Sequence, residues 1–455
     1  MSLQYKISIL IFNLQNQLLQ TEMFRYIHKC ARSTYRTIHS LRQELLKAQG
    51  CAYSTSSPNF PGSEHHKPEW TNTPNFILPE RGSGIPVYRV LGDDGAVIDG
   101  ATNPQLSKDE CMHMYETMVT LNVMDKILYE AQRHGRISFY MTNFGEEATQ
   151  VGSAAALDAK DLIWGQYREA GVLMYRGFPL IQFMHQCYGN RKDIGKGRQM
   201  PVHYGAKDLH FVTISSTLGT QMPQAVGSAY SYKMQGNGQC VVCFFGDGAA
   251  SEGDAHGALN FAATLECPIV FICRNNGYAI STPTHEQYRG DGIASRGVGY
   301  GVATLRVNGN DIFAVYNGVK EAREMAVREN RPVLVEAMTY RIGHHSTSDD
   351  SSAYRSLDEI SYWEQEGNPT KKLEAYLIQQ GYWTSEQTEQ MLKSKRKEVL
   401  TAFAEAENEK IGPMTEAYND VYDVLPQRIQ RQLEETKEHF RKYKDKYSNL
   451  DKFES

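Results

Sequence analysis

The segment that decides the fold runs Cys240-Val-Val-Cys-Phe-Phe-Gly-Asp-Gly248 and resumes, one crossover later, as Pro268-Ile-Val-Phe-Ile-Cys-Arg-Asn-Asn-Gly-Tyr278. Its two apolar runs contain almost no polar residue, which is typical of strands that are covered on both faces. The small residues between them are expected to form a helix that begins near Ala249. One short crossover makes the two strands parallel neighbours or near neighbours. The segment therefore predicts a strand, turn, helix and strand within an α/β domain.

Two polar residues follow these strands where each strand ends. Asp247 comes directly after the first strand, and Asn276 follows the second, 276 − 247 = 29 residues later. Adjacent strands lie about 4.8 Å apart, so the carboxylate and the amide oxygen could bind one Mg²⁺. A carbonyl near Tyr278 and the oxygens of a diphosphate would complete the metal's ligands, while Gly246 and Gly248 allow close approach of the backbone. The alternative interpretation is a purely structural Gly-rich turn.

Composition argues against two classes of protein. With 48 basic and 53 acidic residues the net charge is -5, so no broad basic surface for nucleic acid is expected. The early apolar run Ile7–Phe12 is far shorter than the roughly 18 to 20 residues that cross a bilayer, and no membrane span is expected.

Cys240 and Cys243 fall on opposite faces of a strand, which predicts inert core thiols instead of a metal or redox pair.

The chain divides into five predicted regions. Residues 23–50 are rich in Arg and Lys with one acid, a composition typical of a mitochondrial transit peptide, although a basic surface helix is an alternative. The regions expected are a transit peptide with an upstream extension (1–55), an extended arm (56–104), an α/β domain (105–345), a polar loop (346–362) and a helical region (363–455).

Local patterns add detail at both ends of the chain. In the arm, which is rich in Pro, Gly, Asn and Ser, Val87–Leu91 and Ala96–Ile98 are expected as short strands, and the arm is expected to wrap another partner. Asn368-Pro369 predicts a helix start and Gly381 its end. The next helix should begin with a capping box formed by Thr384 and Gln387. The residues expected on its buried side are Leu392, Val399, Leu400 and Phe403.

The segment from Gly246-Asp-Gly to Asn275-Asn276 is similar to the thiamine-diphosphate motif. Further similarity extends over about residues 106–362 and is strongest at Gly165–Leu173, Gly195–Gly205 and Tyr340–Arg355. Together these stretches resemble the alpha subunits of branched-chain 2-oxoacid dehydrogenases. The resemblance implies a thiamine-diphosphate-binding fold, with a central, mainly parallel sheet flanked by helices, and decarboxylation of branched-chain 2-oxoacids derived from Val, Leu and Ile.

The same resemblance implies roles for individual residues. The residues implied to contact the coenzyme are Tyr167, Arg168, Ser216, Gly248, Ala249, Arg274 and His345, with His345 also catalytic. Those implied to hold Mg²⁺ are Asp247, Asn276 and the Tyr278 carbonyl. Those implied to hold K⁺ are Ser215, Thr220 and Gln221. For the K⁺ residues, a polar helix cap explains the hydroxyl groups almost as well. The substrate pocket implied is Phe139, Tyr167 and Leu218.

Two departures from the family pattern are visible. Asp247 stands where close animal relatives can carry Glu, which keeps the carboxylate and changes only its reach. Thr217 stands where relatives often have Pro, so the shape of that loop is open.

Regulation and assembly also follow from the resemblance. Ser346 and Ser356 are implied phosphorylation sites for a regulatory kinase and phosphatase, whereas the plain interpretation is a flexible surface loop. The implied partners are a beta subunit, in an α2β2 heterotetramer, and the lipoyl-bearing dihydrolipoyl transacylase core, in the mitochondrial matrix.

Three rival interpretations remain at this stage. A pyruvate dehydrogenase alpha subunit would share the fold and coenzyme. A non-catalytic scaffold subunit would keep the fold without binding coenzyme. A nicotinamide-binding module is disfavoured, because Gly236 and Gly238 precede their strand instead of following it.

Overall fold

The computed structural model describes residues 69–78, 83–419, 421–447 and 450–454. Residues 1–81 and 82–455 form two separate units. In the first unit only 69–78 are described, and they form no helix or strand. The predicted transit peptide, 1–55, lies outside the described residues, so all that follows concerns the second unit.

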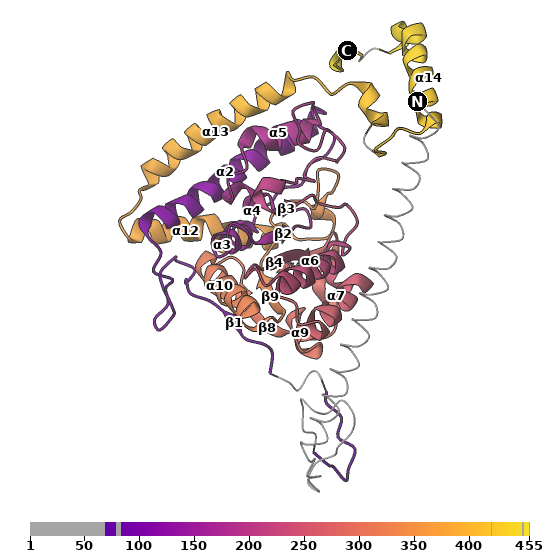
Figure 1. Cartoon of the computed structure of the whole chain (residues 1–455). Helices are drawn as coiled ribbons and strands as arrows, with labels where there is room; N and C mark the ends of the chain where they lie inside the picture. The colour runs from indigo at the N-terminus through magenta and orange to yellow at the C-terminus, as the bar shows by residue number, and fades with distance from the viewer. Residues whose placement is uncertain (1–68, 79–82, 420, 448–449, 455) are drawn as a thin grey trace, which may run out of the picture. The chain divides into compact units, whose positions relative to one another are not determined.

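A seven-stranded sheet forms the centre of this unit (Figure 1). Its strand order is β1-β8-β9-β5-β4-β2-β3, and every neighbouring pair is parallel. The strands are β1 Val87–Tyr88, β2 Leu162–Trp164, β3 Phe211–Val212, β4 Val241–Gly246, β5 Ile269–Asn275, β8 Ala303–Asn308 and β9 Val333–Met338. The predicted α/β fold with a mainly parallel sheet is confirmed.

The two strands predicted from the deciding segment, β4 and β5, are direct neighbours in this sheet. Their register places Gly246 opposite Arg274, so both strands end at the same edge. The helix between them begins later than predicted, because Ala249–Ser251 form a short 3-10 turn and α7 spans Gly253–Thr264. That turn keeps the backbone after Asp247 compact before the α-helix starts.

Helices cover both faces of the sheet because alternate residues of each strand face opposite sides. Val242 and Phe244 of β4 belong to one core cluster, whereas Cys243 and Phe245 belong to another. Helices on the first side are α2 Lys108–Arg133, α3 Glu147–Ala155, α4 Ala170–Tyr175, α5 Leu180–Tyr188 and α10 Ile312–Glu329. Helices on the second side are α6 Gln221–Gln235, α7 and α9 Ala294–Gly299.

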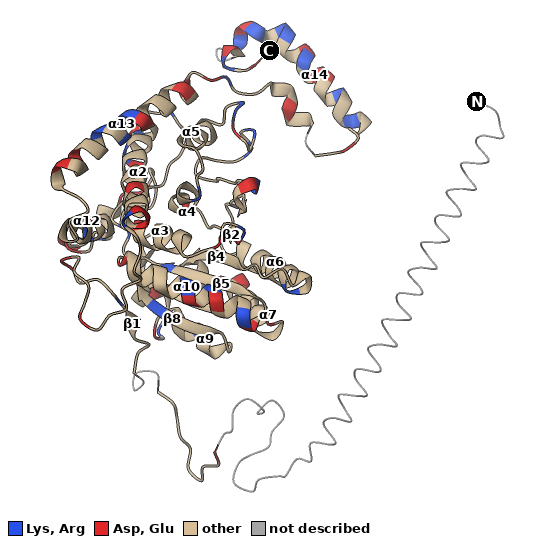
Figure 2. Cartoon of the chain, turned by 60° about the vertical axis from the view of Figure 1, so that its left-hand side comes forward, with Lys and Arg blue, Asp and Glu red and all other residues tan. Residues whose placement is uncertain are grey.

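The remaining elements are short or lie toward the C-terminus. They are β6 Tyr278–Ala279, β7 Thr282–Pro283, α8 Thr284–Gln287, α11 Leu357–Gln365, α12 Pro369–Gln379, α13 Ser385–Glu407, α14 Gln427–Tyr443 and the 3-10 turns at Lys207–Leu209, Ser351–Ala353, Met414–Tyr418, Lys444–Lys446 and Leu450–Lys452. Acidic and basic residues both occur along α13 and α14 (Figure 2). None of the described helices has the length and apolar composition that crossing a membrane requires.

The cysteine prediction is confirmed. Cys240 and Cys243 are both fully buried, and they lie in different core clusters on opposite sides of the sheet. All six cysteines in the described part of the chain are free. Burial raises the pKa of both thiols, which favours their neutral, unreactive form.

The extended arm differs from its prediction. Only Val87–Tyr88 form a strand, β1, and the expected strand Ala96–Ile98 is reduced to a single antiparallel bridge between Val97 and Leu91. Val87–Tyr88 pair with β8 at the edge of the chain's own sheet, and the expectation that the arm wraps a partner stays a prediction. The buried carboxylate of Asp311 accepts hydrogen bonds from the backbone N–H groups of Val90 (2.6 Å) and Leu91 (2.7 Å).

The C-terminal helices begin as predicted. Asn368 accepts hydrogen bonds from two backbone N–H groups at the start of α12, and Thr384 forms the capping box with Gln387 at the start of α13. α13 packs on α2 and α5 (Figure 1). Of the four apolar residues predicted on the buried side of α13, two are buried and two are exposed.

Val399 and Phe403 of α13 are buried, but Leu392 and Leu400 are 43% and 41% exposed. The apolar stripe of this helix is therefore wider than the surface that α2 and α5 cover.

This difference predicts unequal stability changes along α13. Phe403→Ala should lower the free energy of unfolding by about 3 to 5 kcal/mol, because its ring is buried against Tyr188 and the Arg136 guanidinium. The matched variant Leu400→Ala should cost clearly less, because that side chain is already 41% exposed. Urea unfolding of the two variants measures the difference, and equal losses would contradict the packing described.

Candidate active site

Asp247 and Asn276 lie at the carboxyl-terminal edge of the sheet, directly after β4 and β5. Both side chains are almost fully buried. Asp247 accepts a hydrogen bond from Gln287 (2.8 Å), and the Asn276 amide donates one to Glu146 (2.9 Å). The Asn276 amide oxygen accepts from the backbone N–H of Tyr278 at 3.2 Å. The structure thus places all three residues of the predicted magnesium site in one short stretch of this edge.

The Asp247 carboxylate is buried at this edge of the sheet. Burial raises its pKa, and the hydrogen bond from Gln287 opposes that rise only in part. No described Lys or Arg forms an ion pair with it. A bound divalent ion would favour its charged form, since a nearby opposite charge lowers the pKa of a carboxyl group.

The glycine after Asp247 is required by a close approach. A Cβ atom on Gly248 would lie 2.7 Å from the Cβ of Ala279 in β6, so any larger residue would displace this turn. The backbone near the predicted diphosphate site is therefore open only because residue 248 has no side chain.

Two arginines and two glutamates form a buried cluster beside Asn276. Arg274 donates to Glu169 (2.7 Å) and to Glu146 (2.5 Å), and Arg168 lies 3.8 Å from Glu146. Burial lowers the pKa of Arg274, but the two carboxylates raise it by more. Burial likewise raises the pKa of Glu146, while Arg274 and Arg168 lower it by more. Arg274 and Glu146 are therefore both charged.

The cluster leaves N–H groups unused. Arg168 Nε and Arg274 Nη2 are buried and have no hydrogen-bond partner among the described residues. The 3.8 Å between Arg168 Nε and Glu146 is an ion-pair distance and too long for a hydrogen bond. Buried guanidinium groups with free donors are suited to phosphate oxygens. These residues therefore fit a diphosphate group held next to a Mg²⁺ ion.

His345 lies beside this cluster as a neutral imidazole. Its Nδ1 accepts from Arg168 (3.4 Å) and Arg341 (3.3 Å), which places the proton on Nε2. Burial, together with the charges of Arg168 and Arg341, lowers the pKa of His345 to about 3. Its backbone N–H donates to Asp349 at 2.7 Å, and its carbonyl accepts from Arg168 at 2.6 Å. At neutral pH the ring is thus a hydrogen-bond donor through Nε2 and carries no charge.

Comparison with known proteins identifies the family of this chain. Residues 115–415 match the family model described as the dehydrogenase E1 component. The chain belongs to that family. It is 58% identical over 397 residues to 2-oxoisovalerate dehydrogenase subunit alpha, mitochondrial, of Pan troglodytes, covering 87% of this chain and 88% of that protein.

More distant relatives carry similar names. The Caenorhabditis elegans protein named 2-oxoisovalerate dehydrogenase subunit alpha, mitochondrial, is 52% identical over 430 residues, which are 94% of this chain and 100% of that protein. The Arabidopsis thaliana protein named 2-oxoisovalerate dehydrogenase subunit alpha 1, mitochondrial, is 51% identical over 389 residues, covering 86% and 82%. The similarity therefore spans nearly the whole length of these relatives.

Tyr167 is the predicted pocket residue that lies closest to the charged cluster of this E1 family member. Its ring meets the His345 ring edge-on, with centroids 6.1 Å apart, and the guanidinium groups of Arg168 and Arg274 lie 5.3 and 5.9 Å from its centroid. Phe139 packs, half-buried, against the same core cluster as Tyr167, whereas Leu218 is 38% exposed. The substrate pocket remains a prediction.

The predicted potassium residues stand just before and at the start of α6. Thr220 does not cap the helix with its side chain but donates to the carbonyl of Thr217 at 2.9 Å. Gln221 donates to the Phe244 carbonyl at 3.0 Å, and Ser215 is exposed. The helix-cap alternative therefore loses its main support, and the potassium site stays a prediction. In the same loop, Ser216 Oγ lies 2.7 Å from Nε2 of His203.

Ser346 and Ser356, the two serines predicted to be phosphorylated, differ in their exposure and in their hydrogen bonds. Ser346 is half-buried directly after His345, and its hydroxyl accepts from the backbone N–H of Ser348 at 3.3 Å. Ser356 is exposed and caps α11 by accepting from the N–H of Glu359 at 3.1 Å. The expected loop 346–362 is thus helical from Leu357 onward.

Sequence reasoning missed the acids of the charged cluster. Glu146 and Glu169 were not singled out, although Gly145-Glu-Glu147 in an otherwise apolar domain is an unusual pattern. It also missed Asp125 of α2, which is fully buried and accepts from the Tyr140 hydroxyl (2.8 Å) and the Asn143 amide (3.0 Å). Asp125 thereby fixes the segment that carries Glu146.

The lowered pKa of His345 predicts a pH effect on stability. Between about pH 3 and 6.5 the unfolded chain binds a proton at this residue that the folded chain does not. The free energy of unfolding should therefore fall as pH falls below 6.5, by up to about 1.4 kcal/mol per pH unit from this residue.

His345→Gln should make that decline shallower between pH 6.5 and 5. Denaturant unfolding at several pH values measures it. The matched control is His285→Gln, because the His285 side chain is 79% exposed and should leave the pH dependence unchanged. An identical decline in wild type and His345→Gln would contradict the neutral state assigned to this ring.

Proposed function

We propose that this chain is the alpha subunit of a branched-chain 2-oxoacid dehydrogenase. In this proposal it decarboxylates branched-chain 2-oxoacids with thiamine diphosphate and passes the acyl unit to the lipoyl group of a transacylase core. The observation that carries the proposal is the edge where Asp247 and Asn276 lie beside two buried arginines with unused donors. The named relatives, similar over nearly their whole length, support the choice of substrate class and the mitochondrial matrix as location.

The binding of Mg²⁺ and diphosphate follows from the chemistry of the groups present. Asp247, Asn276 and the Tyr278 carbonyl would supply oxygen ligands to Mg²⁺. Among the described residues no cluster of three or more His, Cys, Asp or Glu could hold a metal, so one carboxylate would act with neutral oxygens and the coenzyme's phosphates. Arg168 Nε and Arg274 Nη2 would donate to the phosphate oxygens.

Further residues would line the coenzyme and ion sites. Ser216, Gly248, Ala249 and Tyr167 would contact the coenzyme, with Gly248 giving backbone access. Ser215, Thr220 and Gln221 would hold K⁺. Phe139, Tyr167 and Leu218 would face the branched side chain of the substrate.

His345 would act as a neutral donor. Thiamine diphosphate, when bound, supplies the carbanion that attacks the 2-oxo carbon and the electron sink for decarboxylation. With Nδ1 occupied by Arg168 and Arg341, Nε2–H of His345 is the group that can orient the substrate carbonyl or the acyl unit. Burial and the two arginines keep the ring uncharged, so its role would be a hydrogen bond from Nε2 and not release of a stored proton.

The chain would act with a beta subunit in an α2β2 heterotetramer. The residues described would hold the diphosphate end of the coenzyme, while its aminopyrimidine would need a carboxylate for proton removal. A beta subunit would supply that half of the site. The transacylase core would then receive the acyl unit.

The substrate assignment is tested with the full chain co-expressed with its beta subunit. The heterotetramer should decarboxylate 3-methyl-2-oxobutanoate in preference to pyruvate, as measured by release of carbon dioxide. Preference for pyruvate would favour a pyruvate dehydrogenase alpha subunit. Thiamine diphosphate binding that survives removal of Mg²⁺ by a chelator would contradict the proposed metal site, and no binding at all would favour a scaffold role.

Regulation by phosphorylation is proposed for Ser346, with Ser356 as a second site for a kinase and phosphatase. The charges around Ser346 support it. Asp349 already accepts from His345 N–H, and Arg168 and Arg341 contact the His345 ring. A phosphate on Ser346 would repel Asp349 and compete for the arginines, which would disrupt the position of His345.

Ser346→Glu should therefore abolish most of the overall activity of the assembled complex. The matched control is Ser348→Glu, which adds the same charge two residues away on an exposed side chain and should retain activity. The measurement is the lipoyl-dependent overall reaction. Full activity of Ser346→Glu would count against regulation at this position.

A further inference from the structure

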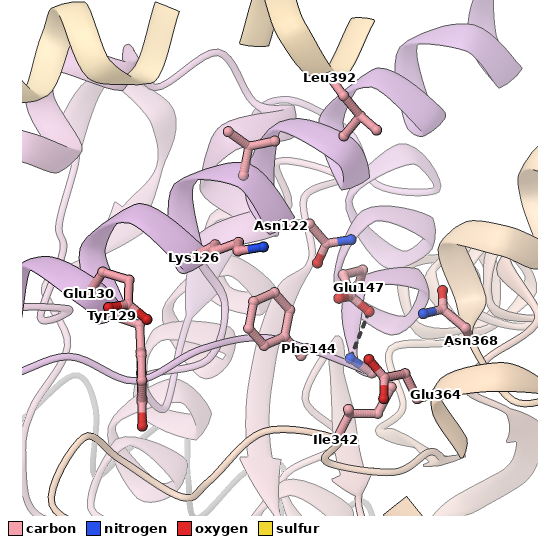
Figure 3. Close-up of a pocket in the computed structure, with 12 residues that line it drawn as sticks. Asn122, Lys126, Tyr129, Glu130, Phe144, Glu147, Ile342, Glu364, Asn368 and Leu392 are labelled. Carbon is pink, nitrogen blue, oxygen red and sulfur yellow. Dashed lines mark hydrogen bonds between the residues drawn. The ribbon is translucent and has the colours of Figure 1, made fainter. Parts of the chain in front are cut away.

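A cavity of about 510 Å³ lies outside the proposed active site (Figure 3). It is bounded by α2, α11, α13 and the segments around Gly145 and Ile342. The residues that line it are Asn122, Val123, Lys126, Tyr129, Glu130, Phe144, Gly145, Glu147, Ile342, Glu364, Asn368 and Leu392. This volume is within the range that small organic ligands occupy in proteins.

The lining of the cavity contains both apolar and charged side chains. Phe144, Ile342 and Leu392 are among its apolar residues, and Leu392 is one of the two α13 residues that were predicted on the buried side but are exposed. In Figure 3, Glu147 and Glu364 lie on the same side of Phe144. An occupant with one apolar and one polar part therefore matches the lining.

The charges of the lining favour a positively charged polar part. It includes three acids, Glu130, Glu147 and Glu364, and one base, Lys126. None of these four side chains forms an ion pair with another residue in the part of the chain that the structure describes. These side chains therefore remain available to pair with an occupant.

Glu147 is the distinctive group in this lining. It is 3% exposed, and its Oε2 accepts from the backbone N–H of Gly145 at 2.9 Å. Burial, together with the charges of Asp125 in α2 and of its own neighbour Glu146, raises its pKa to about 8. The other charged groups in the lining are Lys126, Glu130 and Glu364. At pH 7 the carboxyl group is therefore largely protonated, and a cation beside it would draw it into the charged form.

We propose that this cavity is a second ligand site, which binds a small amphipathic primary amine. The ammonium group lies between the carboxyl groups of Glu147 and Glu364, and the apolar body packs on Phe144, Ile342 and Leu392. This site goes beyond the proposed decarboxylation, because none of its lining residues is assigned to coenzyme, metal or substrate.

The site shares a wall with the proposed active site. Glu146 faces Arg168 and Arg274, whereas the next residue, Glu147, lines the cavity. Ile342 is bonded through its N–H to the Phe144 carbonyl at 3.0 Å and follows Arg341, which contacts His345. An occupant therefore contacts residues that are direct chain neighbours of the charged cluster.

The test uses benzylammonium as the probe on the full chain assembled with its beta subunit. Isothermal titration calorimetry at pH 7, in two buffers of different ionisation enthalpy, measures both affinity and proton release. Benzylammonium should bind with release of up to one proton, and phenylacetate and benzyl alcohol should bind at least about tenfold more weakly. Absence of benzylammonium binding, or equal binding of phenylacetate, would overturn the proposal.

Three variants locate the site. Glu147→Gln should abolish proton release and weaken binding about tenfold, while Glu364→Gln, on the exposed surface of α11, should weaken binding but keep proton release. The control Glu389→Gln replaces an exposed acid of α13 outside the cavity and should change neither. Thiamine diphosphate binding reports correct folding of each variant. Unchanged affinity and proton release in Glu147→Gln would refute the site independently of the proposed enzyme activity.

Discussion

The buried cluster of Glu146, Glu169, Arg168 and Arg274 is the interaction on which the rest of the structure depends. Two arginines can stay charged in a dry interior only because two carboxylates face them, since removing one partner would leave an uncompensated charge. The pairing is nonetheless incomplete, because two N–H groups remain unused. The fold therefore holds its cationic groups in place before any anion arrives, which limits the reorganisation that binding requires.

Much of the sheet could be predicted because its information is local. The apolar runs at β4 and β5 and the short crossover between them determine that the strands are parallel and adjacent, and this places Asp247 and Asn276 at one edge. Glu146 and Glu169 could not be found that way. Their bonds to Arg274 span 128 and 105 residues, and no local pattern in the sequence encodes a partner at that distance.

The errors in α13 and the arm have a related cause. Apolar periodicity identifies which side of a helix tends to be buried, but it does not say how wide the neighbouring surface is, so Leu392 and Leu400, predicted on the buried side of α13, are exposed in this chain. Likewise, a Pro- and Gly-rich composition predicts an extended chain without naming what it pairs with. The β8 edge that receives β1 lies more than 200 residues later.

That pairing has a consequence for proteolytic processing. β8 would be the outermost strand of the sheet without β1, and an uncovered strand edge can recruit strands from other molecules. Cleavage anywhere before Val87 leaves the edge covered. A cut beyond Tyr88 would also free the amide groups that Asp311 now binds, leaving that buried carboxylate without two of its donors. Loss of residues beyond Tyr88 would thus disturb the sheet edge and the buried Asp311 carboxylate together.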